Sequence, residues 1–292
     1  MARAAARLPE NAAGDLYVDD TCIDCALCRQ LAPRVFHRSA RGLSYVHAQP
    51  SSDEDRGRSL MAVVACPTAS IGTADRAGVR AAALRFPDPI APDVEQCGYA
   101  SADSYGASSY LIRRPRGNVL VDSPRAAGPL LRRIAERGGV RFMFLTHRDD
   151  VADHRAFRER FGCERILHAD DVTSDTGTVE RRIEGHDPVQ IDQDLIAIPV
   201  PGHTRGSTAL LYQETFLFTG DHLWGLEGRS GLGASRDVCW YSWTEQVRSL
   251  ERLLDWRFSW VLPGHGSPYC AESPEAMQRD LRALLARARQ IR

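Results

Sequence analysis

The 292-residue sequence predicts an α/β protein in two parts, and three observations support this. Four cysteines gather near the start of the chain, and from Arg80 onward short apolar runs alternate with amphipathic stretches. Clusters of histidine and aspartate follow directly after several of these apolar runs. We therefore expect a disordered arm over residues 1–13, a small α+β domain over 14–75, and a larger α/β domain over 80–292.

The bulk composition limits the classes of partner. Hydrophobic residues make up 43% of the chain and charged residues 26%, as in ordinary soluble globular proteins. The net charge of −1 gives no basic surface for nucleic acid or an acidic membrane, and no apolar run is long enough to cross a bilayer. The first residues lack the apolar core of a secretory signal. We expect a cytoplasmic protein that acts on a small molecule.

Apolar periodicity predicts the elements of both parts. The small part has a helix over residues 53–65 after a polar stretch. In the large part, alternating and continuous apolar runs predict strands over 81–85, 108–112, 118–121, 142–145, 196–200, 208–212, 216–219 and 260–262. Helical spacing predicts helices over 129–137, 151–161, 244–254 and 273–289.

The cysteine pattern predicts an iron–sulfur cluster. Cys22, Cys25 and Cys28 are separated by two residues each, and a distant Cys66 precedes Pro67. Three closely spaced thiolates hold three corners of a cubane and a fourth from elsewhere closes it. Four thiolates also suit a structural zinc ion, but structural zinc sites more often carry two paired C-x-x-C knuckles. A domain of this size has little core, so a metal staple is physically reasonable.

This cysteine segment resembles bacterial-type ferredoxins that carry a single [4Fe–4S] cluster, and the resemblance covers residues 14–75. It implies that Cys22, Cys25, Cys28 and Cys66 hold one cluster. Such a cluster needs reduced thiolates, which favours the cytoplasm. Its role, redox or purely structural, stays open.

The histidine and aspartate clusters predict a second metal site. Each cluster follows a predicted strand, and the ends of strands in a rigid sheet are where converging ligands are usually placed. A glycine lies beside most of these residues and lets the backbone turn sharply. The clusters are Thr146-His147 through Asp153-His154, Pro201-Gly202-His203, Thr219-Gly220-Asp221 and Pro263-Gly264-His265.

From about Arg80 to the C-terminus these motifs resemble the metallo-β-lactamase superfamily, which implies an αββα sandwich with the metal site at one edge. The resemblance implies a first metal position from His147, His203 and Asp221. It implies a second from Asp153, His154, Asp221 and His265, with Asp221 as the bridge. The resemblance therefore implies that one or two zinc or iron ions are bound at this site.

The first motif departs from the family pattern, Thr-His-x-His-x-Asp-His. Two extra residues separate His147 from Asp153, and the second histidine is absent. Asp149 stands in its place with Asp150 beside it, and either carboxylate is available as the missing ligand. This makes the first metal position less secure than the second. We expect Asp150 and His222 to lie just outside the ligands.

The metal decides between functions. With zinc we expect a hydrolase, in which activated water attacks an ester, thioester or related bond and Asp153 orients the nucleophile or accepts a proton. With iron we expect a diiron oxidoreductase that receives electrons from the fused cluster. A non-catalytic electron carrier that docks a redox partner protein is the third alternative.

The aromatic run over residues 240–243 either walls a substrate cavity or packs in the core.

Overall fold

The computed structural model describes residues 2–291, and these divide into two compact units. Of the described residues, the first unit comprises 2–141 and 155–162, and the second comprises 142–154 and 163–291. The expected boundary between residues 75 and 80 falls inside the first unit. Among the described residues, no helix combines the length and apolar character needed to span a bilayer.

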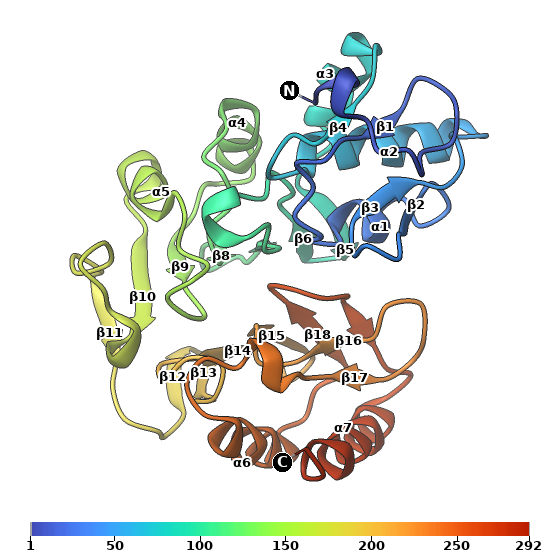
Figure 1. The fold of residues 1–292 in the computed structure, drawn as a ribbon. Helices are drawn as coiled ribbons and strands as arrows, with labels where there is room; N and C mark the ends of the chain where they lie inside the picture. The colour runs from blue at the N-terminus through green and yellow to red at the C-terminus, as the bar shows by residue number, and fades with distance from the viewer. Residues whose placement is uncertain (1, 292) are drawn as a thin grey trace. The chain divides into compact units, whose positions relative to one another are not determined.

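The cysteine-bearing part of the first unit is built from short strands and three α-helices (Figure 1). Helix α2 (Asp53–Ala65), which was predicted, begins where the Ser52 side chain accepts the N–H of Asp55 and ends just before Cys66 and Pro67. The remaining elements are η1 (Ala4–Ala6), β1 (Tyr17–Val18), α1 (Leu27–Leu31), β2 (Phe36–Arg38), β3 (Ser44–Val46), β4 (Ile71–Gly72) and α3 (Arg76–Ala83). Strand β1 pairs with β4, and β2 with β3, both antiparallel.

Two expectations for this region are corrected. The described residues of the expected disordered arm are folded: Leu8 is 3% exposed and its N–H donates to the carbonyl of Val18. The arm is held because an apolar side chain and a strand edge are both available to it. The strand expected over residues 81–85 is instead the end of α3, whose start is capped by the Asp75 carboxylate accepting the N–H of Gly78.

The rest of the first unit is an antiparallel run of strands with two helices. The strands β5 (Asp88–Ala91), β6 (Val94–Gln96), β7 (Tyr110–Ile112) and β8 (Val119–Val121) pair in that order. The helices are α4 (Gly128–Glu136) and α5 (His154–Phe161). Arg125 ties this region to the cysteine-bearing part, because its guanidinium donates to the carbonyls of Ala100 (2.8 Å) and Val64 (3.0 Å). This explains why the first unit extends beyond the cysteines.

The second unit contains two sets of strands. Strands β9 (Phe142–Phe144), β10 (Glu164–His168) and β11 (Arg181–Ile183) pair in parallel. A six-stranded sheet runs in the order β12 (Val189–Asp192), β13 (Leu195–Pro199), β14 (Thr208–Tyr212), β15 (Phe216–Gly220), β18 (Trp260–Pro263) and β19 (Tyr269–Cys270). Only β15 and β18 are parallel within this sheet. A short hairpin, β16 (Trp224–Gly225) and β17 (Leu232–Gly233), follows β15.

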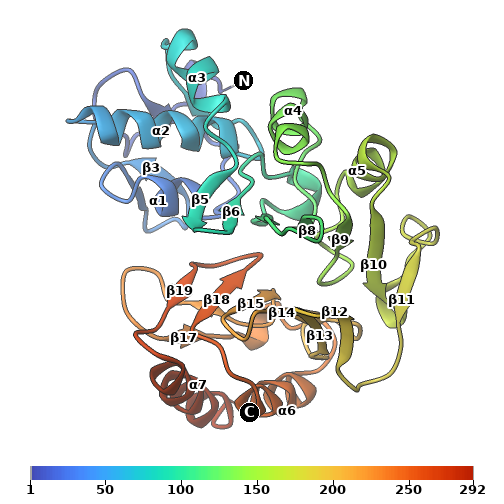
Figure 2. The ribbon, with the colours of Figure 1, turned by 180° about the vertical axis from the view of Figure 1, so that it is seen from behind.

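Two helices cover one face of the six-stranded sheet, α6 (Trp243–Arg252) and α7 (Pro274–Ala288), as both views show (Figures 1 and 2). Leu211 and Val261 of the sheet pack with Leu250 of α6 and Leu281 of α7 in one buried apolar cluster. This core holds the strand ends that carry the histidines and aspartates. The strands expected over residues 142–145, 208–212, 216–219 and 260–262 are confirmed, whereas β10 and β12, which mix apolar and charged residues, were missed.

Candidate metal centres

All four predicted cysteines line one cavity of the first unit, together with Val18, Ile71 and Pro67. Asp24 and Ala26, on either side of Cys25, adopt left-handed φ values of 59° and 67°. Such backbone strain in non-glycine residues persists where the surrounding structure holds it and is common at functional sites. Here the Asp24 carboxylate accepts hydrogen bonds from Arg29 and Arg38, each 2.8 Å long.

The chemistry of the cavity fits an iron–sulfur cluster. Burial raises the pKa of the Cys25 thiol to about 12, with a further contribution from Cys66 and Cys22, and burial also raises the pKa of Cys28. Four thiolates in one apolar cavity would repel one another, so the cavity favours a cationic core that shares their charge. The N–H of Ser70 donates to Cys66 Sγ at 3.3 Å, which supports a sulfur carrying negative charge.

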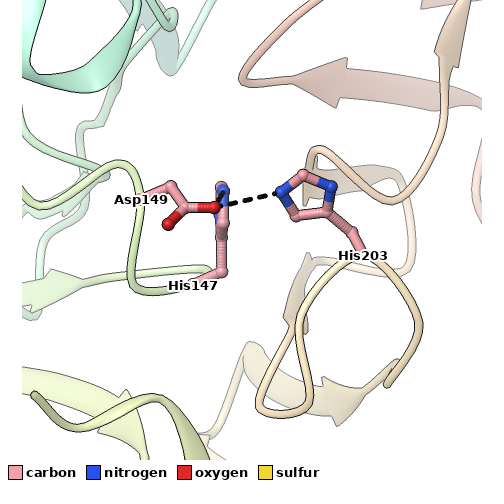
Figure 3. Close-up of side chains that lie close together, drawn as sticks. All are labelled: His147, Asp149 and His203. Atoms are coloured by element: carbon pink, nitrogen blue, oxygen red, sulfur yellow. Dashed lines mark ion pairs between the residues drawn. The ribbon is translucent and has the colours of Figure 1, made fainter. Parts of the chain in front are cut away.

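In the second unit, loops at the ends of four strands bring histidines and aspartates together. Figure 3 shows His147 and Asp149, from the loop after β9, facing His203 from the loop after β13. Asp149 Oδ2 lies 3.4 Å from His203 Nε2 and 3.9 Å from His147 Nε2. Asp221 Oδ2, after β15, lies 3.7 Å from His203 Nε2 and 3.8 Å from His147 Nε2. Each of these two carboxylate oxygens therefore lies within 3.9 Å of both imidazole nitrogens, and the candidate ligand atoms of His147, Asp149 and His203 all lie within 4.8 Å of one another.

This donor set fits a cation. Ligands about 2.1 Å from a tetrahedral metal are about 3.4 Å apart, close to the separations observed. His147 Nε2 is buried and forms no hydrogen bond with any residue in the range 2–291. The other ring nitrogens are anchored: His147 Nδ1 lies 3.0 Å from Thr146 Oγ1, and His203 Nδ1 donates to the carbonyl of Val238 at 2.5 Å. Such outer bonds aim the free nitrogen of a metal-binding histidine.

His265 and Asp150 extend this centre. His265 Nδ1 lies 2.9 Å from both oxygens of Asp221, and its backbone N–H also donates to that carboxylate. Asp150 is 1% exposed, and it forms with His147 and Asp221 a second group whose candidate ligand atoms all lie within 4.8 Å of one another. Gly264 is required here, since a Cβ at this position would lie 2.5 Å from Asp150 Oδ2 and 2.9 Å from Asp221 Oδ1.

The electrostatics favour a positive ion between these residues. Contact with His203 holds the pKa of Asp149 below its usual value, against the effect of burial. Burial alone would raise the pKa of Asp221, but the charge of His265 and of the other two histidines lowers it below the ordinary range. Burial also lowers the pKa of His147, against the effect of the Asp221 charge. The two ionised carboxylates thus place negative charge at the centre, which favours a bound cation.

The protonation of His203 depends on the same carboxylates. Burial opposes its protonation, but the contact with Asp149 and the charge of Asp221 outweigh burial and raise its pKa. In the absence of a cation, a proton on His203 therefore partly neutralises the acidic pair. A bound dication would compete for the same position.

One functional residue was not foreseen from the sequence. Asp171, at the end of η3 (Ala169–Asp171) after β10, is 1% exposed and joins two loops of the centre. It accepts the N–H of Arg148 (3.0 Å), the hydroxyl of Thr204 (2.5 Å) and the N–H of Gly206 (2.8 Å). Asp171 thus fixes the loop of His147 and Asp149 to the loop of His203. Its position after a strand would have been the signal, but β10 itself was not predicted, so this signal was hidden.

His154, which was predicted to bind metal, is not among the close candidate ligand atoms of this centre. Both of its ring nitrogens are engaged elsewhere: Nδ1 lies 3.0 Å from Arg165 Nη1 and Nε2 lies 3.2 Å from Asp175 Oδ2. The two extra residues of the first motif carry His154 into the first turn of α5, which turns its ring away. Asp153 is half-buried just before α5 and belongs to neither group of close metal-binding atoms.

The two predicted metal positions differ in how closely the structure brings their residues together. At the first, Asp149 lies beside His147 and His203, where the family motif has a histidine. At the second, His154 is not among the close candidate ligand atoms. His222 is fully buried, its pKa is lowered to about 3 by burial and then by the charge of His203, and its carbonyl accepts a hydrogen bond from Gln246. Its ring is outside both groups of close metal-binding atoms.

Comparisons with known proteins separate the chain into the two parts that were predicted from the sequence. Residues 18–73 match the family model of the 4Fe–4S single cluster domain of Ferredoxin I. This range lies inside the predicted 14–75 and contains all four cysteines that line the cavity.

The larger part matches proteins of another kind. A hydroxyacylglutathione hydrolase of Rhizobium etli is 29% identical over 144 residues, which is 47% of this chain and 54% of the relative. A hydroxyacylglutathione hydrolase of Rhizobium johnstonii is 28% identical with the same coverage. The chain thus spans about half the length of the curated relatives it matches.

Solved structures give the fold of this part. The DIM-1 metallo-β-lactamase exposed to ceftazidime superposes with a TM-score of 0.51 at 16% identity, covering 69% of this chain and 96% of that one. The B3 metallo-β-lactamase BLEG-1 superposes with a TM-score of 0.50 at 17% identity, covering 65% of this chain and 99% of that one. The chain therefore joins a ferredoxin domain of the single-cluster 4Fe–4S family to a domain with the metallo-β-lactamase fold.

Proposed function

We propose that this chain is a metal-dependent hydrolase that cleaves thioesters. The observation that carries the proposal is that the Nε2 atoms of His147 and His203 each lie 3.4 to 3.9 Å from a carboxylate oxygen of Asp149 and of Asp221. We propose as metal ligands His147, Asp149, His203, Asp221 and His265, with Asp150 beside them. The curated relatives are named for the hydrolysis of an acylglutathione, which is a thioester, and this supports the substrate class.

The residues divide the work of hydrolysis between them. A bound divalent metal ion supplies Lewis acidity, which activates water and polarises a carbonyl. His147 and His203 hold their Nε2 atoms toward the centre because Thr146 and Val238 fix the opposite nitrogens. Asp149, whose side chain is 44% exposed, reaches the solvent side of the centre and is the best-placed carboxylate to orient water and accept its proton. We assign that role to Asp149 in preference to Asp153.

The two alternative functions, a diiron oxidoreductase and a non-catalytic carrier, have less support. A diiron oxidoreductase needs two iron ions side by side, and the second position was expected from Asp153 and His154. His154 is instead bonded to Arg165 and Asp175. A non-catalytic carrier would not need the close convergence of buried histidines and ionised aspartates in the second unit.

We propose that the cluster in the first unit is chiefly structural. Its domain is small, and the cavity of the four cysteines lies among the few apolar residues of that domain. A cytoplasmic location is consistent with this role, since none of the eight cysteines forms a disulfide and cluster assembly needs a reducing compartment.

Metal counting and turnover together test the function. The protein is purified without oxygen, and iron and zinc are counted per chain before an acylglutathione, an oxygen ester and a β-lactam are assayed. We expect about four irons from one cluster, zinc in addition, and turnover of the thioester that Asp149→Asn abolishes. Exposed Asp170→Asn is the matched control. About six irons with no zinc and no thioester turnover would contradict the proposal.

A further inference from the structure

Exposed large apolar side chains gather next to the proposed catalytic centre. Across residues 2–291 there are seven of them, and three lie within residues 238–241. Val238 is 39% exposed, Trp240 61% and Tyr241 49%. We call these three residues the aromatic rim. Because soluble proteins rarely leave neighbouring apolar side chains in water, such a patch marks a surface that binds something.

Backbone hydrogen bonds hold the rim against the loop of His203. The carbonyl of Val238 accepts the Nδ1 proton of His203, while the N–H groups of Trp240 and Tyr241 donate to the carbonyl of His203 at 2.9 and 3.0 Å. The ring centroids of Trp240 and His203 are 6.0 Å apart. The rim is therefore placed beside the metal-binding nitrogens by main-chain atoms, which side-chain substitutions leave in place.

The rest of the aromatic run has a different, structural role. The Ser242 side chain caps α6, and Trp243 is half-buried with its Nε1 donating to the carbonyl of Ala288 at the end of α7. Of the two roles expected for this run, core packing thus applies to Trp243. Trp240 and Tyr241 do not take part in that packing, which leaves their ring faces available.

We propose that the aromatic rim recognises a planar, uncharged, apolar acyl group, such as an aryl group, next to the thioester carbonyl. This inference rests on the proposed function and deepens it. The rim side chains carry no charge, so they offer nothing to an ionic acyl group, whereas an indole face stacks well against a flat ring. The distance to His203 places that ring close to the reacting carbonyl.

A pair of thioesters with the same thiol tests the rim, one with an acetyl and one with a phenylacetyl group. We expect wild-type protein to prefer the phenylacetyl substrate in kcat/KM. Trp240→Ala should reduce this preference about tenfold, equivalent to about 1.4 kcal/mol, through KM with little change in kcat. Trp240→Phe should retain most of it. Tyr105→Ala, which removes an aromatic ring that is 73% exposed elsewhere in the chain, is the control and should have no effect.

A binding measurement separates failure of the rim from failure of the function. Calorimetry with a non-hydrolysable phenylethyl thioether on chelator-treated protein should show weaker binding to Trp240→Ala than to the wild type. If wild-type protein cleaves neither thioester, the proposed function is wrong. The calorimetric comparison of Trp240→Ala with the wild type then decides by itself whether the aromatic rim binds the aryl group. If it cleaves both but Trp240→Ala leaves their ratio unchanged, or slows both equally, the rim proposal is overturned.

Discussion

The two candidate metal centres differ in how their residues are spread along the chain. Three of the four cysteines lie within Cys22–Cys28, on a strained loop and the first turn of α1 that follows it. The histidines and aspartates come from four loops between His147 and His265, each at the end of a different strand. The first centre depends on local backbone conformation, whereas the second depends on the packing of a whole sheet. Substitutions should therefore affect the two centres independently.

The largest expected effect is at the local centre. Cys28→Ser removes a nearly buried thiol from a cavity that needs four, so the cluster absorption should vanish and iron should fall from about four per chain to near zero. The melting temperature of the first unit should fall as well, since the cluster acts as its staple. Cys163→Ala, at a buried cysteine outside the cavity, is the control and should keep its iron. A fully loaded cluster in Cys28→Ser would contradict the assignment.

The next effect is at the distributed centre. His203→Ala removes a nitrogen that lies within 3.7 Å of both Asp149 and Asp221. Zinc affinity, measured by competition with a chelator, should fall by more than the about 10- to 100-fold typical of losing an outer partner, while the iron content stays unchanged. Asp153→Ala should leave zinc affinity close to that of the wild type. The opposite ranking of these two variants would restore the original prediction for Asp153.

A smaller effect is expected where two loops of this centre are joined. Asp171→Asn weakens the acceptor for Thr204 and for the N–H groups of Arg148 and Gly206. Zinc affinity should fall about 10- to 100-fold without a change in the number of zinc ions bound at saturation. Asp170→Asn, at the neighbouring exposed carboxylate paired with Arg205, should bind zinc normally. Equal affinities of the two variants would exclude a positioning role for Asp171.

The smallest effect on metal is expected at His154. His154→Ala should leave zinc binding intact but lower the free energy of unfolding by about 1–3 kcal/mol, because the buried Arg165 loses a hydrogen-bond partner. Urea unfolding measures the stability, and Glu159→Ala on the exposed face of α5 should shift it by less than about 0.5 kcal/mol. Loss of zinc from His154→Ala would show that His154 binds metal after all.

Much of the fold was accessible from pattern alone. Continuous apolar runs such as Thr208–Tyr212 and a capped amphipathic stretch such as Asp53–Ala65 were predicted at their observed bounds, because burial on both faces or a serine cap leaves a clear local signal. The helix at Arg76–Ala83 was predicted as a strand over part of its length, since a short alanine-rich run fits either period. Strand β10 was missed because Arg165 is buried in it by pairing with Glu180.

The sequence by itself determined which residue types are present for two metal centres, and for the cysteines it also determined their arrangement. Spacing within one short segment sets geometry directly, because only a few backbone torsions separate Cys22, Cys25 and Cys28. Only the tertiary structure decided that Asp149 joins His147 and His203 while His154 turns toward Arg165 and Asp175. The side chains of one short motif pointed in different directions once the strand end, the two extra residues and the first turn of α5 were folded.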